Sequence, residues 1–251
     1  MITAIINQKG GVGKSTTAAA LAAGLRLKER KTLLIDLDAQ QNLTYTAGAK
    51  GDDEILNALV FRADIRQAIQ HTAQGDIIAG CPALSNTEQY LRDEIGKEYR
   101  LKEALKDLER EYDEIIIDTP PALGILTINA LTAADRVIIP AQADAYSLQG
   151  IAQLRGTLAA VKQYTNPDLQ IAGILLTRYN ARATLSRKID EMAQQIAETI
   201  GTKVFNIRIR ENISIKEAQL LQKDIFSYAP KSKAAADYSE FIKELEGEQT
   251  Q

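Results

Sequence analysis

Nine consecutive residues near the start of the chain have the clearest chemical potential in the sequence. Three glycines, two lysines and two hydroxyl residues follow one another in Gln8-Lys9-Gly10-Gly11-Val12-Gly13-Lys14-Ser15-Thr16. Glycines allow positive φ and turn successive backbone N–H groups toward phosphate oxygens. In such a loop Lys14 reaches the β- and γ-phosphates and the Ser15 hydroxyl coordinates magnesium. The run therefore predicts a phosphate-binding loop. The alternative, a glycine turn with incidental lysines, is much rarer, because each specified residue type has a frequency of only roughly 7% and the full pattern seldom arises by chance.

The residues on either side of this loop predict the elements that position it. Ile2 to Asn7 is short and β-branched, and Ser15 to Lys28 is rich in alanine and leucine. These compositions favour a strand and a helix, so the loop lies between them. A helix that begins near Lys14 directs the positive end of its dipole at a bound anion.

The rest of the chain repeats this alternation of strands and helices. Further strands are predicted at Thr32–Asp36, Ile77–Ala79, Glu114–Ile117, Arg136–Ile139, Ile171–Leu176 and Lys203–Ile207. Helices are predicted at Tyr99–Glu111, Ser147–Gln163 and Leu185–Ile200. Apolar strands that alternate with helices indicate an α/β fold, in which a mostly parallel sheet is covered on both faces. Ligands of such sheets bind at the carboxyl ends of the strands.

Acidic residues end two of the predicted strands at that edge. Asp36 and Asp38 follow the second strand, and Asp118 closes the apolar run from Glu114. An aspartate in the position of Asp118 lies near bound magnesium, and the two prolines after it stiffen the following segment. Asp36 could be an outer-shell magnesium carboxylate, or one acid of the pair could only cap the strand end.

Composition narrows the class of protein. The chain has 251 residues, of which 45% are hydrophobic and 25% charged, as in ordinary globular proteins. One cysteine excludes an internal disulfide, and no apolar run is long enough to span a bilayer. With no signal-peptide pattern, we expect a cytoplasmic protein. The net charge is −3, yet the segment from Arg178 to Lys216 has eight basic and four acidic residues. That excess could be a solvated face or a nucleic-acid surface.

The loop departs from the strict phosphate-loop pattern, because Gln8 stands where a glycine is usual and Lys9 follows it. In this respect it resembles the KGGVGK[ST] loop of the deviant Walker A ATPases. The segment from Asp36 to Gln40 resembles the DxDPQ switch of the ParA branch, with Ala39 in place of proline, and Ile117 to Pro121 resembles its IDTPP motif. The resemblance covers nearly the whole chain and implies a P-loop NTPase fold.

The family resemblance also implies roles for single residues. Lys9 matches the signature lysine that reaches the ATP of a partner subunit in a nucleotide-sandwich dimer, and Asp38 matches the water-positioning acid. Asn212 matches a residue that approaches adenine, whereas Arg210 and Glu211 depart from the family pattern. ATP and magnesium are the implied ligands. The carried-over catalytic set is Lys9, Lys14 and Asp38.

Within the family, the chain resembles the branch of ParA/Soj-type partition ATPases. This resemblance implies an ATP-dependent homodimer that binds DNA without sequence preference, associates with the nucleoid and is released when a ParB-like protein stimulates hydrolysis. The first strand begins at Ile2, so an N-terminal helix-turn-helix and operator recognition are not expected. The predicted DNA contacts are Arg182, Arg187, Lys188 and Lys216.

Two alternative functions remain open. A MinD-like regulator of cell division attaches to membranes through a basic C-terminal helix, whereas the tail from Asp237 to Glu246 is net acidic. A scaffold that does not hydrolyse ATP would result if Ala39 disables the switch. The nitrogenase iron protein needs two cysteines per subunit and is excluded. No linker divides the chain, so we expect one domain over residues 1–251, with 247–251 as a frayed tail.

Overall fold

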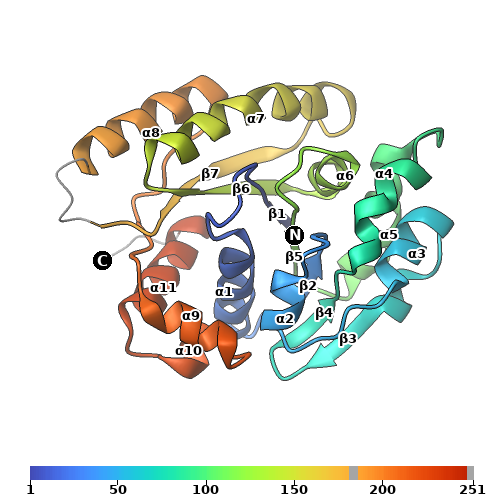
Figure 1. Cartoon of the computed structure of the whole chain (residues 1–251), viewed down its shortest axis with the longest axis horizontal. Helices are drawn as coiled ribbons and strands as arrows, with labels where there is room; N and C mark the ends of the chain where they lie inside the picture. Colours follow the sequence, from blue (N-terminus) through green and yellow to red (C-terminus); the bar gives the residue numbers. More distant parts are fainter. Residues whose placement is uncertain (181–185, 248–251) are drawn as a thin grey trace.

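One twisted sheet forms the centre of the computed structural model, which describes residues 1–180 and 186–247 (Figure 1). Within these residues the sheet has seven strands in the order β3-β4-β2-β5-β1-β6-β7. All neighbours are parallel except β3 and β4. The strands are β1 (Ile2–Ile5), β2 (Thr32–Asp36), β3 (Ile69–Thr72), β4 (Gly75–Ile78), β5 (Glu114–Asp118), β6 (Arg136–Gln142) and β7 (Gln170–Thr177). The mostly parallel sheet predicted from the sequence is confirmed.

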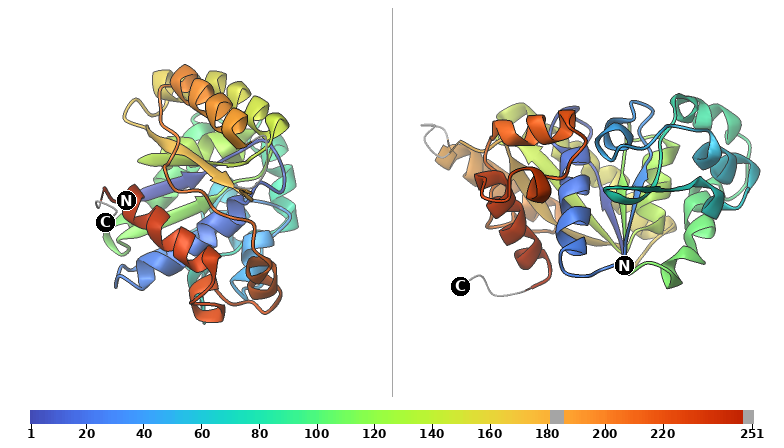
Figure 2. Two further views of the ribbon diagram at one scale, coloured as in Figure 1. Left: turned by 90° about the vertical axis from the view of Figure 1, so that its left-hand side faces the viewer. Right: turned by 90° about the horizontal axis from the view of Figure 1, so that it is seen from below.

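Two layers of helices cover the sheet, one on each face (Figures 1 and 2). One layer contains α1 (Lys14–Arg26), α2 (Asn42–Thr46), α9 (Ile213–Leu220), α10 (Ile225–Tyr228) and α11 (Lys233–Leu245). The other contains α3 (Glu54–Phe61), α4 (Thr87–Tyr90), α5 (Arg100–Leu105), α6 (Ile125–Ala133), α7 (Ala145–Tyr164) and α8 (Ser186–Ile200). Short 3-10 turns lie at Ile65–Ala68, Pro82–Asn86, Lys97–Tyr99 and Leu108–Arg110.

The central strands are apolar on both sides because each side packs against one helical layer. In β5, Ile115 and Ile117 belong to the core under α6 and α7, whereas Ile116 belongs to the core under α1 and α11. Strands with two buried faces read as continuous apolar runs. This is the physical reason why the sequence predicted them.

The strand predicted at Lys203–Ile207 was wrong. The segment forms only an isolated bridge between Val204 and Ile174. The carboxylate of Glu244 accepts the backbone N–H groups of Asn206 at 2.8 Å and Ile207 at 3.0 Å, so a side chain of α11 replaces a strand neighbour. The helix predicted at Tyr99–Glu111 is also shorter, because α5 ends at Leu105 and a 3-10 turn follows.

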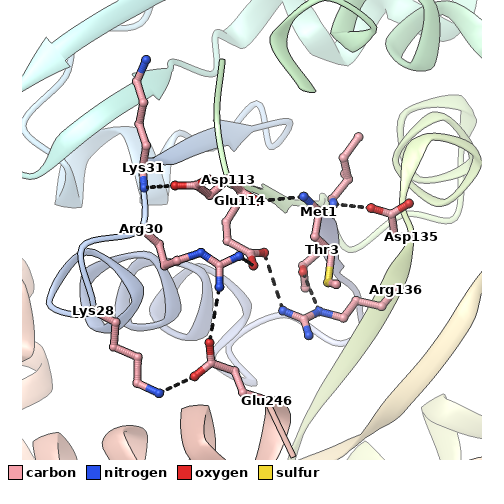
Figure 3. A network of polar contacts seen from close by, with 11 residues as sticks. Met1, Thr3, Lys28, Arg30, Lys31, Asp113, Glu114, Asp135, Arg136 and Glu246 are labelled. Atoms are coloured by element: carbon pink, nitrogen blue, oxygen red, sulfur yellow. Dashed lines mark hydrogen bonds and ion pairs between the residues drawn. The ribbon is translucent and has the colours of Figure 1, made fainter. Parts of the chain in front are cut away.

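A network of charged groups ties the end of the chain to the amino ends of the strands (Figure 3). Glu246, just after α11, pairs with Lys28 and lies 3.8 Å from Arg30. Arg30 in turn pairs with Glu114 at 2.8 Å. The predicted frayed tail falls mostly on residues 248–251, which lie outside the described residues. Among the described helices, none combines the length and apolarity needed to cross a membrane.

Candidate nucleotide-binding site

The glycine-rich loop joins the carboxyl end of β1 to the first turn of α1. Gly11 and Gly13 have φ values of 75° and 93°, a region that favours glycine. Gly13 is the N-cap of α1, and its carbonyl accepts the N–H of Thr17 at 2.8 Å. The hydroxyl of Thr177, at the end of β7, donates to the Val12 carbonyl at 2.7 Å. The loop is therefore held from the sheet side while its N–H groups remain available to an anion.

The loop opens into a cavity of about 620 Å³, a volume typical of small-molecule sites. Its walls include residues 10–16 of the loop, Asp38 and Gln40 after β2, and Pro121 after β5. Thr177, Arg178, residues 209–212 and side chains of α9 complete the lining. The cavity thus collects the carboxyl ends of the parallel strands, as expected for an α/β sheet.

Lys14 lies at the bottom of the cavity with only 7% of its surface exposed. Burial lowers the pKa of its ammonium group, and the nearby carboxylates of Asp118 and Asp38 oppose that shift. A cation held this way has few water contacts to lose when it meets a phosphate. The structure thus places Lys14 where the sequence predicted a phosphate ligand.

Asp118 is buried beside Lys14 because β5 lies between β1 and β2. Its Cα pairs with those of Ile5 and Asp36 in the sheet register. Burial, and next the neighbouring Asp36, raise the pKa of Asp118 well above its usual value, while Ser15 and Lys14 lower it. Within the described residues neither carboxyl oxygen meets strict hydrogen-bond geometry, although the Ser15 hydroxyl lies close enough to stabilise the charged form. A buried carboxyl whose hydrogen bonds are this incomplete indicates a group kept for a ligand.

Asp36 organises the segment that carries Asp38. Its carboxylate accepts the N–H of Asp38 at 3.0 Å, and the N–H and hydroxyl of Thr44 at 2.9 and 2.8 Å. Burial raises the pKa of Asp36, and these hydrogen bonds oppose the shift. Asp38 itself lines the cavity, whereas Asp36 lies behind it. The magnesium role of Asp36 stays a prediction, but its oxygens already hold the Asp38 turn in place.

The arrangement fits a magnesium–nucleotide complex. Among the described residues, no cluster of three or more His, Cys, Asp or Glu could enclose a metal. Magnesium does not need one, because it keeps several waters and uses one or two carboxylates together with substrate phosphates. The carboxyl of Asp118 and the hydroxyl of Ser15 meet that requirement next to the phosphate loop.

Lys9 points away from the other lysine of the loop. Its ammonium group donates to both oxygens of Asp144, at 3.1 and 3.0 Å. Asp144 follows β6 and is the N-cap of α7. Lys9 was identified from the sequence but Asp144 was not, although an acidic residue just before a predicted helix is a recognisable N-cap signal.

Arg210 and Asn212 lie in the segment expected near the nucleotide base, and both have hydrogen-bond partners within the protein. The guanidinium of Arg210 binds the carboxylate of Asp237 in α11 through two nitrogens, which keeps Arg210 against α11. Asn212 is the N-cap of α9 and accepts the N–H of Ser214 at 2.9 Å. Its side-chain oxygen holds the helix cap, and the amide NH₂ remains as a donor that a base could accept from. The adenine contact of Asn212 stays a prediction.

The predicted DNA contacts are only partly placed. Arg182 lies outside the described residues, and Arg187 belongs to α8 without a described side chain. Lys188 and Lys216 lie on α8 and α9 respectively; both are exposed, and Lys216 also lines the cavity. Other cations of the basic segment have partners: Arg208, for instance, binds Asp190 at 3.1 Å.

Comparison with known proteins agrees with this site. A family model described as an AAA domain matches residues 1–171. The chain is 41% identical over 249 residues to the chromosome partitioning protein ParA of Myxococcus xanthus (strain DK1622), covering 97% of this chain and 87% of the relative. It is also 41% identical over 249 residues to the sporulation initiation inhibitor protein Soj of Bacillus subtilis (strain 168), covering 97% of each.

A solved structure shows the same fold. It is cobyrinic acid a,c-diamide synthase from Mycobacterium smegmatis with bound ATP analog and magnesium, with a TM-score of 0.83 and 35% identity over 96% of this chain and 92% of that chain. The bound ligands of that protein are the two that the sequence analysis predicted.

The fold and the loop define a P-loop nucleotide-binding protein of the deviant Walker A class. The chain belongs to the ParA/Soj family of ATPases within that class. The family and the fold predicted from the sequence are thereby confirmed.

Proposed function

We propose that this protein is a magnesium-dependent partition ATPase whose ATP-bound homodimer binds DNA without sequence preference. Hydrolysis, stimulated by a ParB-like protein, would dissolve the dimer and release the DNA. The observation that carries the proposal is the position of Lys14 and Asp38 in the wall of one cavity, with Asp118 buried beside Lys14 and Lys9 bound to Asp144 instead. Relatives named for chromosome partitioning support it.

The residues of the cavity divide the chemistry among them. The loop N–H groups and Lys14 bind the phosphates, and Ser15 and Asp118 would hold magnesium, with Asp36 behind them. When bound, magnesium would supply positive charge that offsets the negative charge of the transition state. Asp38 orients the attacking water by accepting its hydrogen bond. The backbone N–H of Asp38 donates to Asp36, and the Asp38 carboxylate accepts the N–H of Gln40, so both the backbone and the side chain of Asp38 are held in place.

The cations of the basic segment from Arg178 to Lys216 support DNA binding in the dimer. Lys188 and Lys216 are exposed on α8 and α9, and Arg187 precedes Lys188 in α8. Each phosphate that they neutralise contributes about −0.9 to the slope of log affinity against log salt. A dimer presents twice as many cations as a monomer, so ATP-dependent pairing would strengthen binding and its salt dependence together.

The DNA surface is tested by replacing Arg187 and Lys188 with alanine. If both cations bind phosphates in each of two subunits, the change should reduce the salt slope by about 3.6 at most and weaken binding. The matched control is Lys102→Ala with Lys106→Ala, which removes the same charge at two exposed positions in and just after α5. Equal behaviour of the two double variants would show that the α8 cations do not bind DNA.

The membrane alternative is disfavoured by the packing of α11. Its apolar side chains, including Tyr238, Phe241 and Ile242, are buried in the core beneath α1. The rings of Phe241 and Phe205 meet edge to face at 5.0 Å. A helix that has buried its apolar face cannot also insert that face into lipid headgroups. We therefore propose a cytoplasmic protein that associates with the nucleoid when ATP is bound.

One experiment tests the function as a whole. The protein should sediment with long non-specific DNA at low salt in ATP and remain in the supernatant in ADP. Phosphate release, measured with and without DNA, separates an ATPase from a scaffold that does not hydrolyse ATP. DNA binding that ignores the nucleotide, or its complete lack, would refute the proposal.

A further inference from the structure

The ion pair between Lys9 and Asp144 joins two segments that lie far apart in the sequence. The Lys9 ammonium lies 3.1 and 3.0 Å from the two carboxylate oxygens of Asp144, 135 residues away. The side chains are 36% and 31% exposed, so solvent and other anions can reach the pair. The ion pair is therefore strong enough to orient Lys9 and weak enough for another anion to replace Asp144.

Both ends of this ion pair are fixed by other hydrogen bonds. The backbone N–H of Lys9 donates to the Asn7 side chain at 2.9 Å. Asp144 accepts the N–H of Ser147 at 2.8 Å and so caps the first turn of α7. The Ser147 hydroxyl accepts the N–H of Gln142 at 3.0 Å, which holds the turn between β6 and α7. Asp144 thus occupies a defined place, and Lys9 is drawn to it.

We propose that Asp144 is a positioning residue that holds Lys9 within its own subunit until a nucleotide triphosphate of a second copy displaces the carboxylate. This inference rests on the proposed function, in which Lys9 reaches a partner's ATP. The Lys9 ammonium group donates two of its three N–H bonds to Asp144, and a phosphate next to that carboxylate would be repelled by its negative charge, so the two anions compete for Lys9. The terminal phosphate of ATP has more charge than a carboxylate and competes for the lysine, whereas ADP lacks that group. Asp144 therefore raises the dissociation constant of the dimer, and it increases the difference in dimerisation between ATP and ADP.

The variant Asp144→Asn separates the two roles of this side chain. Asparagine is as good an N-cap as aspartate, so the first turn of α7 keeps its hydrogen bond. The charge that holds Lys9 is lost. An exposed ion pair changes an equilibrium constant by about 1.4-fold to fivefold. Since two lysines are released per dimer, the dimer dissociation constant should fall by about twofold to twenty-five-fold.

The measurement is sedimentation velocity over a range of protein concentrations, in magnesium with a slowly hydrolysed ATP analogue. The control is Glu103→Gln, which breaks an exposed ion pair with Arg62 of similar length, 2.9 Å, away from the phosphate loop. The ADP affinity of each variant, measured by calorimetry, shows that the loop is intact. Asp144→Ser, which also keeps a capping oxygen but has no charge to hold Lys9, should reproduce the gain.

The outcomes separate this inference from the function on which it rests. Tighter dimers of both Asp144 variants, with Glu103→Gln unchanged, support the inference. If the native protein dimerises and the variants pair equally or more weakly, Asp144 does not restrain Lys9, and only the inference fails. If neither the native protein nor the variants dimerise with the analogue, the sandwich dimer fails and the inference fails with it.

Discussion

The two lysines of the loop should respond differently to mutation, and this is the sharpest test of the site. Lys14 is buried in the cavity beside Asp118 and Asp38. Lys9 is half-exposed and pairs with Asp144 in its own subunit. We expect Lys14→Met to remove most of the nucleotide affinity, and Lys9→Ala to leave the affinity of the monomer nearly unchanged while it prevents ATP-dependent dimerisation.

The size of the Lys14 effect follows from the interaction that it would make with phosphate. A hydrogen bond to a charged group contributes about 1.5–3 kcal/mol, and every 1.4 kcal/mol is a factor of ten in affinity. Without the Lys14 ammonium, binding should therefore weaken by about tenfold to more than a hundredfold. Methionine is chosen because it has a similar length and leaves no large cavity where the lysine stem was.

Calorimetry with ADP measures the monomer without the complication of dimerisation, and the same titration with an ATP analogue adds the dimer. Circular dichroism of each variant shows whether the fold is kept. For Lys9→Ala, the ADP isotherm should match that of the native protein within about twofold, because Lys9 has its partner elsewhere. Equal losses of ADP affinity in the two variants would refute the division of roles between the lysines.

Two further results are expected. Asp38→Ala should still bind magnesium and ATP through Lys14, Ser15 and Asp118 but hydrolyse slowly, so the dimer should accumulate in size-exclusion chromatography with ATP; hydrolysis at the native rate would leave Asp36 as the candidate. Glu114→Gln tests the charged network at the amino ends of the strands, where burial raises the pKa of Glu114. An acid whose pKa is raised by folding stabilises the native state fully below its unfolded pKa, and this contribution is lost as pH rises through the folded value. Relative to native protein, Glu114→Gln should gain stability between those two values in urea denaturation; parallel curves would contradict the shift.

The features that the sequence predicted well are those encoded in consecutive residues. The phosphate loop needs glycines at Gly11 and Gly13 and cations beside them, so one short run specifies the backbone and the chemistry together. The strands β2 and β5 were predicted closely because both of their faces are buried, which leaves an unbroken apolar run. Asp118 could be placed from the same pattern, since it directly follows such a run.

The features that could not be predicted depend on residues that meet only in the fold. Lys203 to Ile207 has the composition of a strand, yet Glu244 of α11 accepts the backbone N–H groups of Asn206 and Ile207. Arg210 lies in the segment predicted to approach the nucleotide base, but Asp237 binds its guanidinium. Asp144 gave no local signal that it would meet Lys9. In each case the deciding partner is a carboxylate at least 27 positions away in the sequence.

The position of Asp118 beside Asp36 lowers the stability of the fold and is explained by function instead. Their Cα atoms pair across β5 and β2, so two carboxyl groups share the interior, and the ammonium of Lys14 offsets the charge of Asp118. Such an arrangement disfavours the charged forms of both acids, which is why burial raises both pKa values. A core selected for stability alone would have apolar side chains there. The sheet instead keeps Asp118 buried with incomplete hydrogen bonding among the described residues, next to a cavity lined by the phosphate loop. The cost in stability is therefore best explained by the ligand that the site is built to receive.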